Sequence, residues 1–230
     1  LHGVGLGHIL HRRANLLDHA EQRFLEIARG LALQPSFILL DEPAGGLTTQ
    51  EIEHLGNVIR TLRDSGTDVV VSYLPVGSEM ATKWYVEQIL DAGCAFVNCI
   101  PVFIVSDPYW EKRLIKAGIP AIGDDMRSQL GASVMSQALQ ELFFNRGMKV
   151  KFHEQTNHGG NTDFLNMLAR ERLKSKKISK TNAVQSILPA PLEPENIHIG
   201  PSDYVPFLKD KKLCFLRIEG KKFGDVPINV

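Results

Sequence analysis

The sequence Thr67-Asp68-Val69-Val70-Val71-Ser72-Tyr73 is a short β-branched run built around three consecutive valines. Such a continuous run is typical of a strand that is buried on both faces, as strands of parallel sheets are. Turn-forming residues follow, Leu74-Pro75-Val76-Gly77-Ser78, and residues 79–91 then show a helical apolar pattern. A strand, a turn and a helix in this order predict an α/β fold that binds ligands beyond the carboxyl end of the strand.

The same alternation of strand-like and helix-like segments extends on both sides of this run. Helical periodicity appears over residues 22–33, 49–65 and 128–146. Short apolar runs predict strands over residues 36–41, 94–98, 119–122, 148–152 and 213–218. The pattern therefore predicts a Rossmann-like, doubly wound and mostly parallel sheet with helices packed on it.

Composition narrows the classes of function. The chain has 230 residues, and its 26 Lys and Arg balance its 26 Asp and Glu. This zero net charge argues against nonspecific binding to nucleic acid or to an acidic membrane. No apolar run approaches the roughly 20 residues that a membrane span needs. The first residues show no signal pattern and the chain has only three cysteines, so we expect a cytoplasmic protein without a disulfide framework.

Two adjacent acids, Asp41 and Glu42, follow the predicted strand over residues 36–41. Acids at the end of a buried strand are costly unless they face a cation or a ligand. Asp41 could hold Mg²⁺ and Glu42 could orient an attacking water. The alternative is an acid pair on a surface turn, and the pair alone does not decide between the two.

Residues 21–31, together with Ile38-Leu39-Leu40-Asp41-Glu42-Pro43-Ala44-Gly45-Gly46-Leu47, resemble the ATPase subunits of ABC transporters, especially those for branched-chain amino acids. The resemblance covers residues 17–67 and implies a Walker B strand with Asp41 on the Mg²⁺ side and Glu42 as the catalytic glutamate. Asp18 replaces the family's phosphate-contacting serine, and a carboxylate there repels phosphate. The sequence also contains no G-x-x-x-x-G-K-[ST] loop, so binding and hydrolysis of Mg-ATP is the alternative function and not the first one.

From residue 67 onward the chain resembles bacterial and archaeal inositol-3-phosphate synthases. The motifs that carry this resemblance are residues 68–79, Gly123-Asp124-Asp125-Met126-Arg127-Ser128-Gln129, residues 159–166, 175–180, 198–203 and 224–227. The resemblance implies NAD-dependent conversion of glucose 6-phosphate to inositol 3-phosphate by oxidation, aldol ring closure and reduction. It also implies that an α+β catalytic portion follows the parallel sheet. We therefore expect a hybrid, with an ATPase-like segment over residues 1–66 packed as part of the sheet and a synthase-like region over residues 67–230.

The residues also indicate a basic patch for a sugar phosphate. Ser175, Lys176, Ser179 and Lys180 fall at i, i+1, i+4 and i+5, which places two hydroxyls and two ammonium groups on one side of a helix. Such a face is often merely solvated when it occurs alone. Asp124 and Asp125 follow a predicted strand and open a predicted helix, so capping is the alternative for that pair.

The resemblance to the synthases assigns roles to specific residues. It implies catalytic roles for Arg127, Lys176, Lys180 and Asp203, NAD contacts for Ser72, Tyr73, Pro75, Gly77, Asn98, Asp124 and Asp125, and substrate contacts for Ser128, Gln129, Asn157, Asn161, Asp163, Ser175 and Ser179. No standard zinc spacing occurs, so no metal is predicted.

Two departures from the synthase pattern predict impaired catalysis. The family has a lysine where this chain has Arg127, and a guanidinium hardly ever releases a proton. The family's N-terminal glycine-rich NAD fingerprint and its C-terminal segment are not in this sequence. The expected partners are a sugar phosphate and further copies of the chain, with no nucleic acid and no membrane span; an inactive assembly module is a further alternative.

Overall fold

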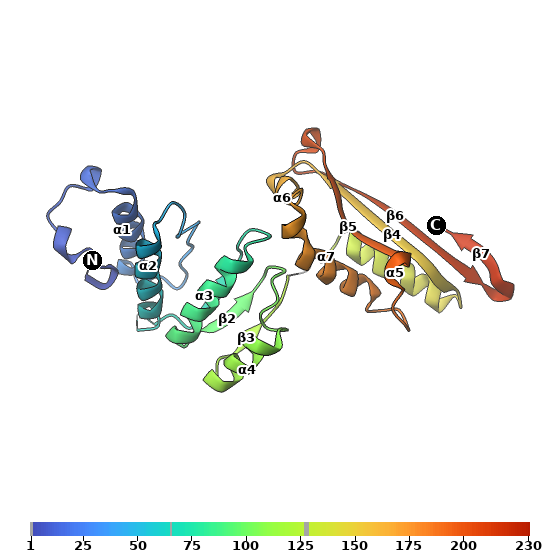
Figure 1. Ribbon diagram of the computed structural model, residues 1–230, viewed down its shortest axis with the longest axis horizontal. Coiled ribbons are helices and arrows are strands. Elements are labelled where there is room, and N and C mark those ends of the chain that lie inside the picture. The colour runs from blue at the N-terminus through green and yellow to red at the C-terminus, as the bar shows by residue number, and fades with distance from the viewer. Residues whose placement is uncertain (1, 65, 127–128) are drawn as a thin grey trace. The chain divides into compact units, whose positions relative to one another are not determined.

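The structure is a computed structural model that describes residues 2–64, 66–126 and 129–230 (Figure 1). The chain divides into two compact units. The first contains the chain up to Val71 together with residues 80–97 and 108–122, and the second contains residues 72–79, 98–107 and 123–230. Short 3-10 helices lie at His2–Val4, Gly7–Ile9, Ala14–Leu16, Pro194–Asn196, Pro206–Leu208 and Phe223–Asp225.

Helices α1 (His19–Ala32) and α2 (Thr49–Leu62) confirm the helical periodicity of the N-terminal segment. Each begins with a capping box: the Asp18 carboxylate accepts the Glu21 N–H at 2.8 Å, and Thr48 and Glu51 form the matching pair on α2. Their apolar stripes meet in one buried cluster of Val4, Leu6, Ile9, Ala20, Phe24, Ile27, Leu55, Val58 and Ile59. Burial of these side chains gives this segment its own core.

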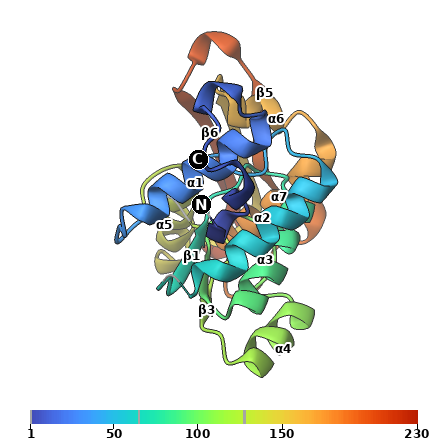
Figure 2. The same cartoon turned by 90° about the vertical axis from the view of Figure 1, so that its left-hand side faces the viewer.

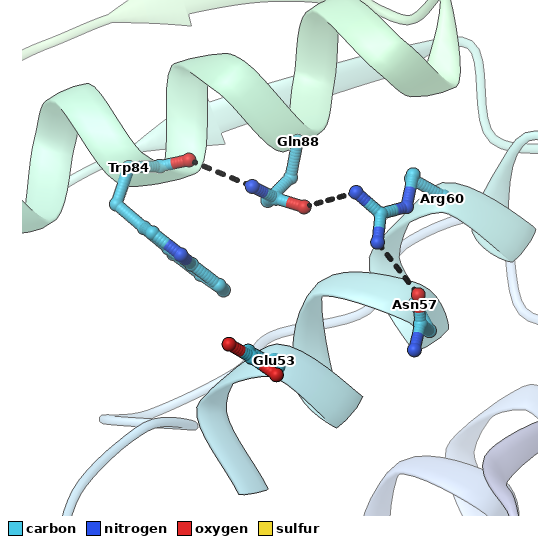
Figure 3. Close-up of a pocket in the computed structure, with 5 residues that line it drawn as sticks. All are labelled: Glu53, Asn57, Arg60, Trp84 and Gln88. Atoms are coloured by element: carbon cyan, nitrogen blue, oxygen red, sulfur yellow. Dashed lines mark hydrogen bonds between the residues drawn. The ribbon is translucent and has the colours of Figure 1, made fainter. Parts of the chain in front are cut away.

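Helix α3 (Glu79–Ala92) packs beside α2, as Figures 2 and 3 show. Arg60 on α2 donates to Gln88 Oε1 on α3 at 2.8 Å and to Asn57 Oδ1 at 2.6 Å. Gly56 allows this approach, because a Cβ there would lie 2.7 Å from Gln88 Oε1. The ATPase-like segment and the start of the synthase-like region thus share one packed unit.

The first sheet has the strand order β1-β2-β3, from β1 (Val69–Ser72), β2 (Ala95–Asn98) and β3 (Ala121–Ile122). β2 and β3 are parallel, with Phe96 opposite Ala121. Helix α4 (Pro108–Ala117) connects them. The prediction that β1 is buried on both faces is wrong, because Val69 and Val71 are 49% and 50% exposed at the edge of the sheet.

The predicted strand over residues 36–41 is not a strand in the structure. Phe37 and Leu39 are 88% and 96% exposed, and the sheet order contains no strand from this segment. An apolar run forms a strand only where a neighbouring strand satisfies its backbone groups, and this segment has none. The expectation that the ATPase-like segment adds a strand to the sheet is therefore corrected.

The second unit is built on a four-stranded mixed sheet with the order β5-β4-β6-β7. β4 (Lys149–Gly159) is parallel to β5 (Ile197–Tyr204) and antiparallel to β6 (Lys212–Lys222), which pairs with β7 (Val226–Asn229). Helices α5 (Ala132–Asn145) and α7 (Arg170–Gln185) pack against this sheet, and α6 (Thr162–Asn166) precedes α7 (Figure 1).

The fold class is confirmed: a parallel α/β portion is followed by an α+β portion with a mixed sheet. The prediction that Asp124 and Asp125 open a helix is wrong, since α5 begins only at Ala132. Among the described helices, none is long and apolar enough to span a bilayer.

The exposed placement of residues 36–41 can be tested by a matched pair of truncations. Leu55 is fully buried, and Leu39 is 96% exposed. We expect Leu55→Ala to lower the free energy of unfolding by about 2 to 5 kcal/mol, and Leu39→Ala to change it by about 0.5 kcal/mol or less. Urea unfolding measures both values, and an equal loss for the two variants would contradict the placement.

Candidate functional site

The loops that follow β1, β2 and β3 are tied together by backbone hydrogen bonds within the second unit. Cys99 N donates to Ser72 O at 3.1 Å, and Met126 N donates to Cys99 O at 3.0 Å. Asp125 N donates to Ile100 O at 3.1 Å. The carboxyl ends of the three strands therefore lead into one bonded group of loops, where open parallel sheets bind ligands.

The Asp124 carboxylate accepts several hydrogen bonds within this group of loops. Its carboxylate accepts from the backbone N–H groups of Ile104, Val105 and Ser106 at 2.9, 3.1 and 3.2 Å, and from the Ser106 hydroxyl and Asn98 Nδ2, both at 2.8 Å. Asn98 is buried and also donates to Val102 O at 2.7 Å. Both side chains were predicted to contact the cofactor, and the structure uses both to shape the loop.

Asp125 adopts a backbone conformation that is unusual for an L-residue, with φ of 69°. Its Oδ2 accepts from the hydroxyl of Ser179 on α7 at 2.8 Å. This bond joins the loop after β3 to the lysine-bearing helix. A strained backbone held by hydrogen bonds on both sides is a frequent feature of functional sites.

The predicted lysine patch lies on α7, as expected. Lys176 Nζ donates to Asp163 Oδ2 at 3.0 Å, and its side chain is 13% exposed. Burial, together with the positive charges of Lys176 and Lys212, lowers the pKa of Lys180 to about 8, and the charges of Asp163 and Asp125 offset part of this effect. Lys180 is thus a lysine that exchanges a proton near neutral pH.

Lys212, at the start of β6, is a member of the cluster that sequence reasoning missed. Its charge acts on Lys180, and its Nζ lies 5.4 Å from the centre of the Phe164 ring. Lys211 and Lys212 form a basic pair directly before an apolar run, and this pair is the feature of the sequence that could have indicated a further basic residue at the site. Lys176, Lys180 and Lys212, with Asp163 and Asp125, form a group that we call the lysine cluster.

The remaining predicted catalytic and substrate-binding residues take different positions. Asn161 caps α6 by accepting the Phe164 N–H at 3.2 Å, and Asn157 is buried within β4. Asp203 is exposed and accepts its neighbour Tyr204 N–H at 2.8 Å. Gln129 lies in the segment before α5. Arg127, Ser128 and the side chain of Ser175 lie outside the described residues.

The last residue of β1 supplies an unsatisfied hydroxyl next to the loop that follows. Ser72 Oγ is buried and has no hydrogen-bond partner in the described structure. Ser78 N donates to Pro75 O at 3.1 Å and closes a turn in which Gly77 has φ of 90°. Tyr73 is 68% exposed beside this turn. A buried hydroxyl without a partner is costly, so this loop is suited to a polar ligand.

The predicted ATP-like residues do not form a site. Asp41 is exposed, and Glu42 lies in a turn with φ of 42° that closes by a 2.8 Å bond from Gly45 N to Glu42 O. Because no strand holds them, the carboxylates are not fixed at a sheet edge. Among the described residues, no group of three or more His, Cys, Asp and Glu side chains is placed to hold a metal ion.

A separate hollow of about 260 Å³ lies between α2 and α3 in the first unit (Figure 3). It is lined by Glu53, Asn57, Arg60, Trp84 and Gln88. None of the predicted site residues lines it.

Comparison with known proteins agrees with both resemblances. Residues 131–230 match the family described as Myo-inositol-1-phosphate synthase. The chain is 53% identical to an inositol-3-phosphate synthase of Mycobacterium tuberculosis over 174 residues, which are 76% of this chain and 47% of that protein. The chain therefore spans about half the length of the curated relatives that it matches.

Two further similarities complete the comparison. A 68-residue stretch, 30% of this chain and 29% of the relative, is 46% identical to an uncharacterized ABC transporter ATP-binding protein of Thermotoga maritima. The crystal structure of an inositol-3-phosphate synthase from Caenorhabditis elegans matches with a TM-score of 0.63 at 16% identity, over 95% of this chain and 51% of that one, which shows a shared fold. The hybrid resemblance predicted from the sequence is confirmed.

The shifted pKa of Lys180 predicts a pH-dependent stability. The value is about 8 in the folded chain and 10.5 for an ordinary lysine, so between these pH values the unfolded chain binds more protons. The free energy of unfolding should therefore rise with pH between about 8 and 10.5. Lys180→Met should remove this rise, and Lys222→Met at an exposed position should keep it. Urea unfolding at several pH values measures the slope; a rise that persists in Lys180→Met would contradict the burial of this amine.

Proposed function

We propose that this chain carries the nicotinamide end and the sugar-phosphate part of an inositol-3-phosphate synthase site. The reaction converts glucose 6-phosphate to inositol 3-phosphate. The lysine cluster is the observation that carries this proposal. Three basic side chains gathered around two carboxylates favour a ligand that is both anionic and rich in hydroxyls.

The cluster suits the charges that the reaction develops. Oxidation of a hydroxyl, deprotonation next to the resulting ketone and ring closure each place negative charge on oxygen, which preplaced ammonium groups stabilise. Asp163 holds Lys176 in place at 3.0 Å. Lys180, with its pKa of about 8, is able to accept a proton from carbon or oxygen and return it.

The loop after β1 fits the nicotinamide end of NAD. The orphaned Ser72 hydroxyl and the Pro75–Gly77 turn, with Tyr73 beside it, would contact the cofactor, while Asp124 and Asn98 would hold the loop that supports it. NAD would accept a hydride from the sugar and return it after ring closure, so that substrate and product have the same composition. Because Asp125 bonds to Ser179 on α7, the cofactor loop and the lysine cluster are held together.

Calorimetric titration with two ligands tests this proposal. We expect Lys176→Met to weaken binding of glucose 6-phosphate by about tenfold and to leave NAD⁺ binding unchanged. Ser72→Val should weaken NAD⁺ binding by about fivefold and leave the sugar phosphate unaffected. Each variant is the control for the other, and glucose without phosphate should bind no better to wild type than to Lys176→Met. Folded wild-type protein that binds neither ligand at millimolar concentration would refute the proposal.

We also propose that copies of the chain associate through one face of the second sheet. His153, Gln155 and Asn157 are buried, whereas the alternate residues of β4 lie on the opposite face. Leu213 and Phe215, each 58% exposed, pair across the sheet with His158 and Thr156 of that face.

Charge complementarity favours a second copy of the chain as the partner of this face. Glu154 and Arg217 are also cross-strand partners on it, so a two-fold axis would bring opposite charges together.

Light scattering tests this association. Phe215→Lys should convert an oligomer to a monomer, because it places a charge in the apolar centre of the face. Phe207→Lys, at a position 80% exposed outside the sheet, should leave the assembly intact. Wild-type protein that is monomeric at micromolar concentration, or a Phe215→Lys variant that stays oligomeric, would contradict this interface.

A further inference from the structure

A line of hydrogen-bonded side chains runs through the buried interface between α5 and β4. Gln140 Nε2 lies 2.7 Å from His153 Nδ1, and His153 Nε2 lies 3.1 Å from Ser136 Oγ. The Ser136 hydroxyl donates to Gln155 Oε1 at 2.7 Å. All four side chains are fully buried, so their polar groups must find hydrogen-bond partners within the protein and not in bulk water.

The line continues along β4 to its neighbour β5. Gln155 Nε2 donates to Asn157 Oδ1 at 3.4 Å, and Asn157 Nδ2 donates to Gly200 O at 3.0 Å. Asn157 pairs with Pro201 in the β4–β5 ladder, directly before a register shift. Proline has no N–H, so the Asn157 side chain supplies a hydrogen bond where the ladder is weakened.

The carbonyl of Gly200 sets the direction of the whole line, because a carbonyl only accepts. Asn157 must turn its NH₂ toward Gly200, which leaves its oxygen for Gln155. Gln155 must then donate to Asn157, so its own oxygen accepts the Ser136 hydroxyl. Ser136 in turn accepts from His153 Nε2–H.

The histidine at the far end is therefore neutral. Its Nδ1 carries the lone pair that accepts from Gln140, and burial lowers the pKa of His153 to about 4. The arrangement leaves Gln140 Oε1 buried and without a partner in the described structure. An unpaired buried oxygen costs free energy. It is consistent with a line in which the Gly200 carbonyl fixes which group donates in every bond, because Gln140 must then donate through its NH₂ group and leave its oxygen unpaired.

The line ends next to the lysine cluster. Asn157 and Cys214 are directly opposite in the β4–β6 pairing, and the charge of Lys180 acts on the Cys214 thiol. Beyond Asn157, β4 leads to Asn161 and Asp163, and beyond Gly200, β5 leads to Asp203. The Asn157 side chain thus joins β4 to β5 close to the points where the chain leads to these residues.

We propose that Gln155 is a positioning residue for the sugar-phosphate site, acting through Asn157 to fix the ends of β4 and β5. This inference rests on the proposed function for its ligand, glucose 6-phosphate. Gln155 is the link because it alone joins the α5 side of the line, at Ser136, to the strand-end side, at Asn157.

Two matched variants test the inference. Gln155→Met and Gln140→Met remove the same amide from equally buried positions, one at the link to Asn157 and one at the far end of the line. Both should lower the urea midpoint, because both leave buried groups unpaired. Only Gln155→Met should weaken glucose 6-phosphate binding, by about tenfold, and only it should speed amide hydrogen exchange in residues 199–204. If Gln155→Met does not fold, Ser136→Ala replaces it, with the same expectations.

Nitrogen NMR of the His153 ring gives an additional readout that needs no ligand. The expected state at pH 7 is the neutral ring with its proton on Nε2. A proton on Nδ1, or a folded Gln155→Met with unchanged binding and exchange, would overturn the inference. If wild type fails to bind glucose 6-phosphate, the proposed function falls; the exchange difference between the two variants then still decides whether Gln155 fixes the strand ends.

Discussion

The hydrogen bond from the Ser179 hydroxyl to Asp125 links two parts of the second unit that are far apart in the sequence. Asp125 belongs to the loop after β3, and Ser179 directly precedes Lys180 on α7, one helical turn after Ser175. The proposed chemistry needs a hydride acceptor and basic groups within reach of one sugar ring. This bond holds the loop of Asp125 against the helix that carries the lysines.

Adjacent aspartates divide two tasks in this loop. The Asp124 carboxylate accepts hydrogen bonds from the backbone N–H groups of residues 104–106 and from Asn98. Asp124 therefore acts as a fixed anion that shapes the loop. That anchorage holds the backbone of Asp125 at a positive φ, which a free loop would leave. Asp125 is then free to meet Ser179 and to act on Lys180. Both residues were predicted to contact NAD, and the hydrogen bonds show that Asp124 bonds within its own group of loops whereas Asp125 bonds to α7.

The sequence pattern predicted helices well, because a helix depends mainly on residues that are close together in the sequence. The helical apolar stripe was sufficient to locate α2, and the spacing of Lys176 and Lys180 placed both on one helix. Residues 36–41 failed because a strand depends on a partner that the sequence pattern does not contain. Lys212 was missed because it lies on β6 and its neighbours Lys180 and Phe164 lie on α7 and α6, which only the tertiary fold brings together.

The ATPase-like segment contributes packing to this structure, and the reason lies in which of its side chains are buried. Leu55 and Val58 are buried in the cluster against which Trp84 and Tyr85 of α3 also pack. Gly56 admits Gln88 and Trp84 at close range, and Arg60 joins Gln88 across the two helices (Figure 3). Asp41 and Glu42, the residues that ATP chemistry would require, lie instead on an exposed turn. The side chains of this segment that are buried thus serve the packing against α3.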